Sequence, residues 1–354
     1  MNKKKKVNIL IIGPDSPHVA SFISRWNSED VELEVISSGD KHIRVSKNHM
    51  LHFSLLHFWN FLITPLKIRR IAKRFQPDIV WMHQANSYSL YPILALKKRY
   101  PIVLTVWGSD VLVAPNQSRW IKKMTRYILQ HVDAITADAH SLGEKALELS
   151  PKKNTPLYIC QFGIQPIAVS LSKEQVIYSN RGHKSLYRIK DVIAAFHRFQ
   201  QNQPFSWRLV IAGNGSETAA LKQLVDELDL TEHVEFVGFL SPQENAAWYG
   251  RSELYISIPA SDGTAVSLLE AMHYGCLPIV SDLPANREWI THGKNGYIAT
   301  DLTIDFIKEA LTIDPTQAKQ ENTSLIQSLA TPEASSVKFQ SVITDLLHTQ
   351  KRSS

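Results

Sequence analysis

Residues 261–299 read SDGTAVSLLEAMHYGCLPIVSDLPANREWITHGKNGYIA. An apolar run precedes this stretch, a short loop containing Gly263 opens it, and a helical pattern of apolar residues follows as far as Tyr274. Gly275 ends that pattern, and a second apolar run comes next at 278–281. The order strand, loop, helix and strand predicts one unit of a parallel sheet that is covered by helices.

The same alternation extends over the rest of the chain. Apolar runs predict strands at 7–12, 31–37, 78–83, 102–107 and 134–137, with 157–161 closing the first half, and then at 175–179, 207–212, 234–239, 254–258, 278–281 and 296–299. Helical patterns lie between them at 19–27, 51–75, 87–99, 120–132, 142–149, 190–200, 217–228, 242–249 and 265–274, with two more helices in 303–348. Near-continuous apolar strands separated by helices are typical of parallel sheets buried on both faces. We therefore expect an α/β protein with two Rossmann-like, doubly wound parallel-sheet domains that face each other across a cleft.

A loose stretch at 163–172 looks like a linker between the two halves. We expect an N-terminal domain over 1–165 and a C-terminal domain over 166–332, with a helix at about 333–354 that could pack back on the first domain. The length of 354 residues agrees with two domains at about 150 residues each.

The composition excludes several classes of protein. Two cysteines, Cys160 and Cys276, cannot build a disulfide framework or a four-thiolate zinc site, and they suit a reducing compartment. No apolar run is long enough for a spanning helix, and the apolar stretch after MNKKKK is too short for a signal peptide. We expect a cytoplasmic protein.

Positive charge is concentrated in the first half of the chain. Residues 1–165 hold 23 Lys and Arg against 12 Asp and Glu, a net charge of +11, whereas residues 166–354 hold 16 against 21, a net charge of −5. One half is therefore built to face something anionic.

Two first-half segments mix this charge with apolar side chains. In 53–75 an aromatic and aliphatic block precedes Lys67, Arg69, Arg70, Lys73 and Arg74, and 120–127 repeats the mixture. Such a mixture suits a helix that lies in the lipid headgroup plane, although a core helix with a basic solvated end fits either segment alone. No nucleic-acid module accompanies the charge, so we expect an anionic membrane surface as partner and no nucleic acid.

Two carboxylates stand eight residues apart in the opening stretch, with Asp262 in the loop and Glu270 near the middle of the predicted helix. Gly263, Thr264 and Ala265 come at the helix start, where free N–H groups and the helix dipole favour an anionic phosphate. On spacing alone, an N-cap by Asp262 with a solvated Glu270 is an equally good interpretation.

The wider pattern resembles the donor-site motif of glycosyltransferase family 4. That motif reads Glu-x7-Glu and then Ala-Met-x-x-Gly-x-Pro-x-Val, and it stands here as Asp262, Glu270, Ala271, Met272, Gly275, Pro278 and Val280. The tail from Glu288 to Gly296, the pair Gly213 and Gly215, the segment after Arg181, and the loop Trp107-Gly108-Ser109-Asp110 are similar to further family motifs. The resemblance implies a GT-B fold and sugar transfer from a nucleotide donor with retention at the anomeric carbon.

The resemblance also implies roles for single residues. Glu270 would accept hydrogen bonds from the ribose hydroxyls, Asp262 would hold hydroxyls of the donor sugar, and Arg181 would pair with the diphosphate. Asp110 would join Asp262 and Arg181 as a catalytic residue. Donor-binding residues would further include Gly13, which lets backbone approach the diphosphate, and Gly213, Gly263, Thr264, Ala265 and Lys184.

Two positions depart from the family pattern. The family usually has Glu where Asp262 stands, and it often has Lys where Leu186 stands. Lys184 or Arg188 could take over the role of that lysine.

We expect neither a metal nor another cofactor. The chain has no Asp-x-Asp pair, and the spacing of His49, His52 and His57 puts only the first two on one helical face. The nucleoside-diphosphate sugar, linked to UDP or GDP, would be a substrate, and Arg181 with helix N-termini would replace a metal ion.

The sequence thus predicts a hexosyltransferase that moves a hexose or N-acetylhexosamine to a saccharide or lipid-linked saccharide acceptor. It would serve cell-surface polysaccharide biosynthesis, peripherally associated with the inner face of the cell membrane. A catalytically degenerate GT-B scaffold subunit and a GT-B sugar-nucleotide epimerase remain alternatives. A phosphorylase is disfavoured because no lysine–pyridoxal signature is present.

Overall fold

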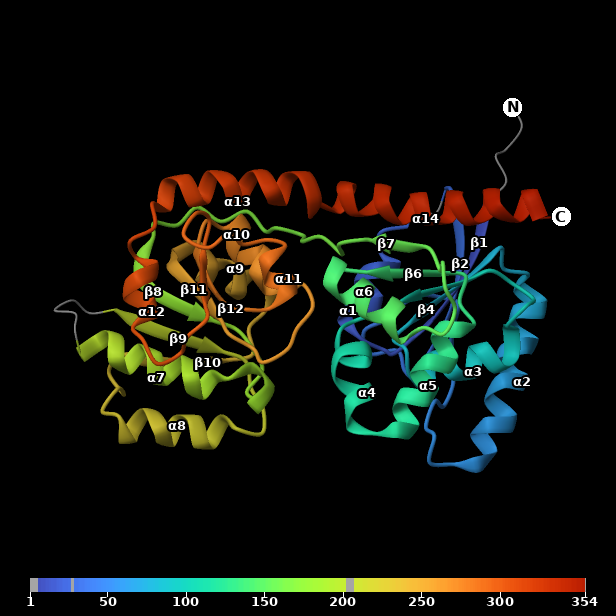
Figure 1. Ribbon diagram of the computed structural model, residues 1–354, viewed down its shortest axis with the longest axis horizontal. Coiled ribbons are helices and arrows are strands. Elements are labelled where there is room, and N and C mark those ends of the chain that lie inside the picture. Colours follow the sequence, from blue (N-terminus) through green and yellow to red (C-terminus); the bar gives the residue numbers. More distant parts are fainter. Residues whose placement is uncertain (1–5, 27–28, 202–206, 354) are drawn as a thin grey trace. The chain divides into compact units, whose positions relative to one another are not determined.

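The computed structural model describes residues 6–26, 29–201 and 207–353 (Figure 1). The basic residues at 3–5, Asn27 at the end of one predicted helix, and residue 354 at the end of another lie outside the described residues. The chain divides into two compact units. Unit 1 comprises Met1–Phe162 and Pro332–Ser354, and unit 2 comprises Gly163–Thr331.

Unit 1 is built on a seven-stranded sheet. Its strands are β1 (Val7–Gly13), β2 (Val31–Ser37), β3 (Asn48–Met50), β4 (Ile79–His83), β5 (Ile102–Thr105), β6 (Ala134–Ala137) and β7 (Leu157–Ile159). Its helices are α1 (Pro17–Ile23), α2 (Phe58–Phe75), α3 (Ser87–Leu96), α4 (Ala114–Gln117), α5 (Arg119–Gln130), α6 (His140–Leu149) and α14 (Pro332–Ser353), with a π-helical turn at Ser109–Val113. The strand order is β3-β2-β1-β4-β5-β6-β7, and every pair is parallel.

Unit 2 is built on a six-stranded sheet in the order β10-β9-β8-β11-β12-β13, again with parallel pairs. Its strands are β8 (Glu174–Ser179), β9 (Arg208–Ala212), β10 (Val234–Gly238), β11 (Ser252–Ser257), β12 (Leu277–Ser281) and β13 (Tyr297–Ala299). Its helices are α7 (Ile189–Gln201), α8 (Thr218–Glu227), α9 (Pro242–Arg251), α10 (Val266–His273), α11 (Pro284–Arg287), α12 (Phe306–Ala310) and α13 (Pro315–Leu329), with a 3-10 turn at Ser185–Tyr187. These two sheets confirm the predicted α/β class.

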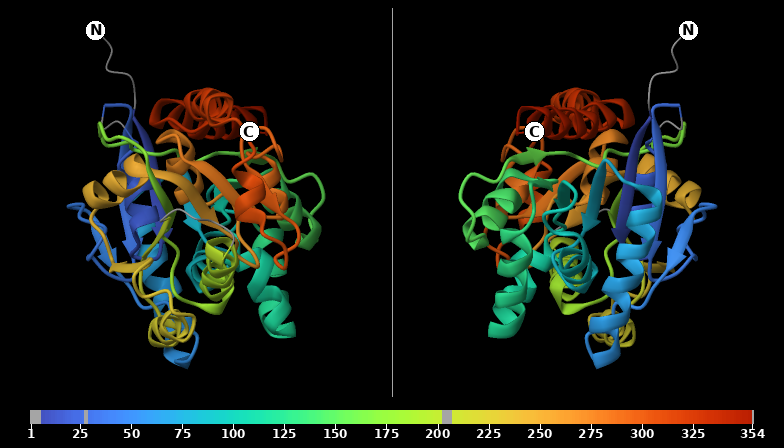
Figure 2. Two further views of the ribbon diagram at one scale, coloured as in Figure 1. Left: turned by 90° about the vertical axis from the view of Figure 1, so that its left-hand side faces the viewer. Right: turned by 90° about the vertical axis from the view of Figure 1, so that its right-hand side faces the viewer.

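Both faces of each sheet are buried, which explains the near-continuous apolar strands. In unit 2, Ile177 packs with α7, α8 and α12, while its neighbour Tyr178 packs on the opposite face with Tyr249 of α9. In unit 1, Ile9 and Trp81 share one core with α1 and with Phe339 of α14. Figure 2 shows α14, in red, end-on.

Parts of the structure differ from the predicted elements. The helix predicted over 51–75 begins only at Phe58, and residues 48–50 form the short strand β3 beside β2. The sequence Asn48-His49-Met50 contains no apolar run that could mark a strand. The region 303–348, where two helices were predicted, contains α12, α13 and α14.

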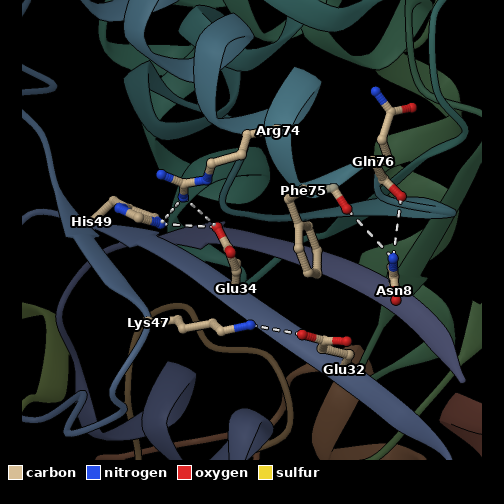
Figure 3. Close-up of polar contacts among 8 residues, drawn as sticks. All are labelled: Asn8, Glu32, Glu34, Lys47, His49, Arg74, Phe75 and Gln76. Atoms are coloured by element: carbon tan, nitrogen blue, oxygen red, sulfur yellow. Dashed lines mark hydrogen bonds and ion pairs between the residues drawn. The ribbon is translucent and has the colours of Figure 1, made fainter.

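Polar contacts fix the C-terminal end of α2 to the sheet (Figure 3). The buried carboxylate of Glu34 accepts from Arg74 at 3.0 Å and lies 2.9 Å from His49 Nε2. The Asn8 amide group reaches the carbonyl oxygens of Phe75 and Gln76, each at 3.4 Å. Arg74 is therefore a structural residue as well as a surface charge.

Candidate functional site

The two loops that carry the predicted donor residues follow neighbouring strands of unit 2. Arg181 comes after β8 and Asp262 comes after β11, and β8 lies between β9 and β11 at the point where the strand order reverses. Open α/β sheets bind ligands outside the carboxyl ends of their strands at such a switch point. We call Arg181, Asp262, Glu270 and residues 263–265 the candidate donor site.

Arg181 is the centre of this site. Its guanidinium donates to Asp262 Oδ2 at 2.5 Å and to Ser267 Oγ at 3.0 Å, and it lies 4.5 Å from the centre of the Tyr187 ring. The Arg181 side chain is only 11% exposed, whereas that of Asp262 is 25% exposed. Asp262, Ser267 and Tyr187 therefore hold the guanidinium group in one orientation.

The Asp262 carboxylate keeps Arg181 charged. Burial alone would lower the pKa of Arg181, but the carboxylate of Asp262 reverses that effect and the pKa is raised.

Glu270 lies on α10, three residues after Ser267. It accepts from Asn245 Nδ2 at 3.4 Å. Burial raises the pKa of the Glu270 carboxyl, although hydrogen bonds from Tyr249 and Asn245 oppose that rise. The alternative of a solvated Glu270 is therefore not what the structure shows.

The loop before α10 contains the predicted phosphate-binding residues. Ala265 is the N-cap of α10 and makes no side-chain capping bond, so Asp262 does not cap this helix. Asp262 Oδ1 instead accepts from the amide of Gly263 at 3.1 Å. Thr264 Oγ1 accepts from Trp289 Nε1 at 3.3 Å, which ties the loop to a buried indole.

Gly213 and Gly215 allow the loop after β9 to touch the loop after β8. A Cβ at Gly213 would lie 2.8 Å from the carbonyl oxygen of Arg181, and a Cβ at Gly215 would lie 2.3 Å from that of His183. Gly213 also has a φ of 109°, which other residues rarely adopt. Gly213 thus supports the backbone that carries Arg181.

Leu186, where the family often has Lys, lies next to the Asp262 loop, because its carbonyl oxygen accepts from Ala260 N at 2.8 Å. Lys184 is exposed, and Arg188 pairs with Asp191 at 3.5 Å. Their predicted substitution for that lysine stays a prediction.

The unit 1 residues of the prediction lie in tightly packed surroundings. Asp110 is buried, and its oxygens accept from the amides of Ala85 at 2.7 Å and Trp107 at 2.9 Å. Burial raises the pKa of its carboxyl, against the lowering effect of these amides. Asp110 therefore holds two loops together, and its predicted role as a catalytic residue stays a prediction.

Gly13 ends β1, and a Cβ there would lie 3.1 Å from His83 Cβ and 3.2 Å from Val19. Internal packing is thus one reason for this glycine. Its predicted approach to the diphosphate stays a prediction.

Sequence reasoning missed two polar partners of the site. Ser267 binds Arg181, and Asn245 binds Glu270. Ser267 could have been found, because it precedes Glu270 by three residues and so shares its helix face. Asn245 comes from α9, and no spacing rule connects it with Glu270.

The described residues form neither a metal-binding cluster nor a membrane-spanning helix. In the described part of the chain, no group of three or more His, Cys, Asp or Glu side chains could hold a metal ion. No helix formed by the described residues is long and apolar enough to cross a membrane.

Family models match both units. The model described as "Glycosyl transferases group 1" matches residues 164–313, and the model described as "Glycosyl transferase 4-like" matches residues 8–139. Together the two matches span most of the chain.

Individual proteins are similar at lower identity. The N-acetyl-alpha-D-glucosaminyl L-malate synthase of Bacillus anthracis is 25% identical over 66% of this chain and 64% of its own length. The alpha-monoglucosyldiacylglycerol synthase of Streptococcus pneumoniae is 23% identical over 61% of this chain and 54% of its own length. The chain thus matches less than two thirds of the length of either relative.

The fold is shared with solved structures. The crystal structure of HepE from Anabaena in complex with UDP and glucose aligns with a TM-score of 0.77 at 12% identity, covering 96% of this chain and all of the HepE chain. With its two parallel sheets and two matching family models, this chain belongs to the glycosyl transferases group 1 family, which comprises retaining glycosyltransferases of the GT-B fold.

Proposed function

We propose that this protein transfers a hexose or N-acetylhexosamine from a nucleoside-diphosphate sugar to a lipid-linked saccharide, with retention of configuration. The observation that carries the proposal is the buried Arg181 fork, held by Asp262 and Ser267 at the switch point of unit 2 with Glu270 on the adjoining helix. Unit 2 would bind the donor, and unit 1 would bind the acceptor.

Each donor contact has a physical basis. Among the described residues, Arg181 donates to Ser267 and Asp262, and its guanidinium carries five N–H groups, so it can also donate to a diphosphate oxygen. Glu270, half-enclosed by polar side chains, suits the ribose hydroxyls, and Asp262 suits a hydroxyl of the sugar. The amides of residues 263–265 would add N–H donors at the start of α10.

The reaction would need no strong nucleophile. As the glycosidic bond breaks, negative charge builds on the departing diphosphate, and Arg181 would stabilise it more in the transition state than in the bound donor. A diphosphate oxygen would take the proton of the attacking acceptor hydroxyl on the same face of the sugar. This account uses no metal ion, with Arg181 in its place.

The relatives support the class of donor. One relative is named for an N-acetylglucosaminyl group and another for a glucosyl group, which favours a hexose or N-acetylhexosamine here. HepE was crystallised with UDP and glucose, which favours a UDP-linked donor over a GDP-linked one.

The surface of α2 supports a membrane-bound acceptor. An apolar stripe of large side chains is exposed at and just before its N-terminal half: Leu56, Phe58, Trp59, Leu62, Ile63 and Leu66. Lys67, Arg69, Arg70, Lys73 and Arg74 are exposed in its second half. In α2 only Thr64, Ile68, Ala72 and Phe75 are buried, so most of its large apolar side chains face solvent.

This combination suits peripheral association with an anionic membrane, where apolar side chains enter the interface and cations meet the headgroups. The relative from Streptococcus pneumoniae is named as a synthase of a glucosyl diacylglycerol, which is a lipid, and this also favours a membrane-bound acceptor. A place in cell-surface polysaccharide biosynthesis at the inner face of the membrane would follow from such an acceptor.

Thermal unfolding with UDP-, GDP- and ADP-sugars tests the donor assignment. A donor at a hundred times its Kd should stabilise the wild-type protein by about 2.7 kcal/mol. The shift should be smaller in Glu270→Ala and unchanged in the control Glu244→Ala, which removes an exposed carboxylate from the start of α9. No shift with any sugar nucleotide would contradict the proposal.

A further inference from the structure

We propose that a pocket in unit 1 holds an uncharged sugar ring, the headgroup of a glycolipid acceptor. This inference rests on the proposed function and names the class of its acceptor. The pocket has a volume of about 350 Å³ and is lined by Ser38, residues 51–54, Ser87 and Tyr88. These residues follow β2 and β3 and open α3, so the pocket lies at the carboxyl edge of the sheet.

The lining combines hydroxyl groups and His52 with the apolar side chains of Leu51 and Phe53. Hydroxyl groups come from Ser38, Ser54, Ser87 and Tyr88, and the seven lining residues include no Lys, Arg, Asp or Glu. A carboxylate or phosphate would need a cationic partner to offset its loss of hydration. Sugar hydroxyls can instead both donate to and accept from such side chains.

Ser38 illustrates the fit. Its Oγ accepts from the Tyr88 hydroxyl at 3.0 Å and from the amide of Asp15 at 3.2 Å. Both lone pairs are then in use, so the Ser38 O–H remains as a donor for an acceptor oxygen.

One wall of the pocket is aromatic. The half-buried Tyr88 ring packs on the buried ring of Phe53, with centroids 4.6 Å apart, and Phe53 packs in turn near Tyr91. A ring held in this way can receive the apolar C–H face of a sugar. The volume is at the low end for small-molecule pockets and suits a short saccharide headgroup.

The pocket wall is bonded to the first turns of α2. Thr64 Oγ1 donates to the carbonyl oxygen of His52 at 2.9 Å, and Asn60 Nδ2 donates to that of Ser54 at 2.9 Å. Directly after this wall, Leu56 is 92% exposed and Trp59 is 68% exposed. A ligand with a sugar and an alkyl chain could occupy the pocket and the start of the apolar stripe together, whereas a free saccharide would use the pocket alone.

Binding of simple glycosides to the full-length protein tests this inference. The probes are methyl and hexyl glycosides of glucose, galactose, mannose and N-acetylglucosamine, with malate and glucose 6-phosphate as anionic comparisons. We expect at least one glycoside to bind, and its hexyl form to bind about tenfold more tightly than its methyl form. Tyr88→Ala should weaken the binding about tenfold, and Tyr88→Phe less.

Two controls keep the result interpretable. Tyr100→Ala removes a half-buried tyrosine of unit 1 that does not line the pocket, and it should leave glycoside binding unchanged. Leu56→Ser with Trp59→Ser should remove the advantage of the hexyl chain but keep methyl glycoside binding.

The inference is overturned if no glycoside binds, if an anion binds in a manner that depends on Tyr88, or if hexyl and methyl forms bind equally. Donor binding separates this failure from that of the proposed function. Tyr88→Ala should show the wild-type thermal shift with a sugar nucleotide, which also reports that it folds. If wild type shows that shift and the glycoside tests fail, only the pocket assignment is lost.

Discussion

Arg181 is the residue on which the chemistry depends most. Arg181→Ala should lower kcat by about 10²- to 10³-fold and weaken donor binding less, because the contact strengthens as charge develops on the diphosphate. Arg188→Ala is the matched control, since Arg188 is a more exposed arginine of the same segment that pairs with Asp191. Steady-state kinetics measure kcat and the donor KM of both variants. An unchanged kcat in Arg181→Ala, with a loss in Arg188→Ala, would move the role to Arg188.

Glu270 should affect binding more than turnover. Glu270→Ala removes a buried acceptor for ribose hydroxyls and leaves them unpaired, at a cost of about 1–3 kcal/mol. The Kd of the donor, measured by calorimetry, should rise about 5- to 150-fold. A donor Kd equal to that of wild type would remove Glu270 from the ribose contact.

His83 makes the fold sensitive to acid. It is fully buried at the end of β4 between the rings of Phe22 and Trp107, and neither ring nitrogen has a hydrogen-bond partner in the described part of the chain. Burial, helped by nearby His18, lowers its pKa from 6.5 to about 3. Between these values the unfolded chain binds a proton that the folded chain does not, so stability falls as the pH drops.

His83→Leu should lack this loss of stability. Below pH 6.5, the wild-type protein should lose about 1.4 kcal/mol of unfolding free energy per pH unit relative to His83→Leu. Urea unfolding at neutral pH and at pH values down to about 4 measures the difference. A difference that does not change with pH would show that His83 titrates alike in the folded and unfolded chain.

At the scale of elements, α2 carries the membrane prediction. Replacing Lys67, Arg69, Arg70 and Lys73 with Gln should reduce binding to vesicles that contain anionic lipid, since each cation near such a surface contributes about 1 kcal/mol. Arg74 is kept, because its loss would remove one of the two cationic partners that the described residues give the buried Glu34 (Figure 3). High salt should release the wild-type protein from the vesicles.

The matched control replaces four exposed lysines on other helices: Lys190, Lys222, Lys308 and Lys338. It should bind vesicles like wild type, and both variants should keep their donor affinity. If the α2 variant and the control sediment equally with vesicles, α2 is not the membrane contact.

The residue ranges of helices and strands could be predicted best where the sequence contains a strong apolar run. The strands β2 and β6 occupy the predicted residues. All four residues of β6 are buried, as expected for a strand covered on both faces, whereas β2 begins with apolar residues that alternate with Glu32 and Glu34 and ends in a fully buried stretch. The short strand β3 carries no such signal, and its backbone pairing with β2 and the side-chain contacts of Asn48 and His49 with Ser37 and Glu34 appear only in the folded chain. The start of α2 was misplaced for the opposite reason, since residues 51–57 are apolar enough to continue a helical pattern although the helix begins only at Phe58.

The candidate sites show what a sequence leaves open. The loop residues Asp262 to Ala265 stand together in the sequence, so their common location could be predicted. The sugar pocket brings Ser38, residues 51–54 and Tyr88 together from separate loops, and no motif joins them. The occupation of both Asp110 oxygens by backbone amides likewise depends on the folded chain.

At the scale of the whole molecule, the reaction should survive chelation of metal ions. This prediction rests on the absence of an Asp-x-Asp pair from the sequence and on the buried Arg181 at the candidate donor site. Initial rates with and without EDTA should agree within about twofold. Complete loss of activity in EDTA, restored by Mg²⁺ or Mn²⁺, would contradict a metal-independent mechanism.

Turnover by the purified full-length protein tests the central claim most directly. The measurement is release of nucleoside diphosphate from UDP- and GDP-sugars in the presence of a hexyl glycoside acceptor, with NMR of the product. The account predicts a new glycosidic bond with the anomeric configuration of the donor, formed at least about 10²-fold more slowly by Arg181→Ala. Binding of a sugar nucleotide without transfer, by wild type and variant alike, would contradict it and indicate a degenerate scaffold subunit.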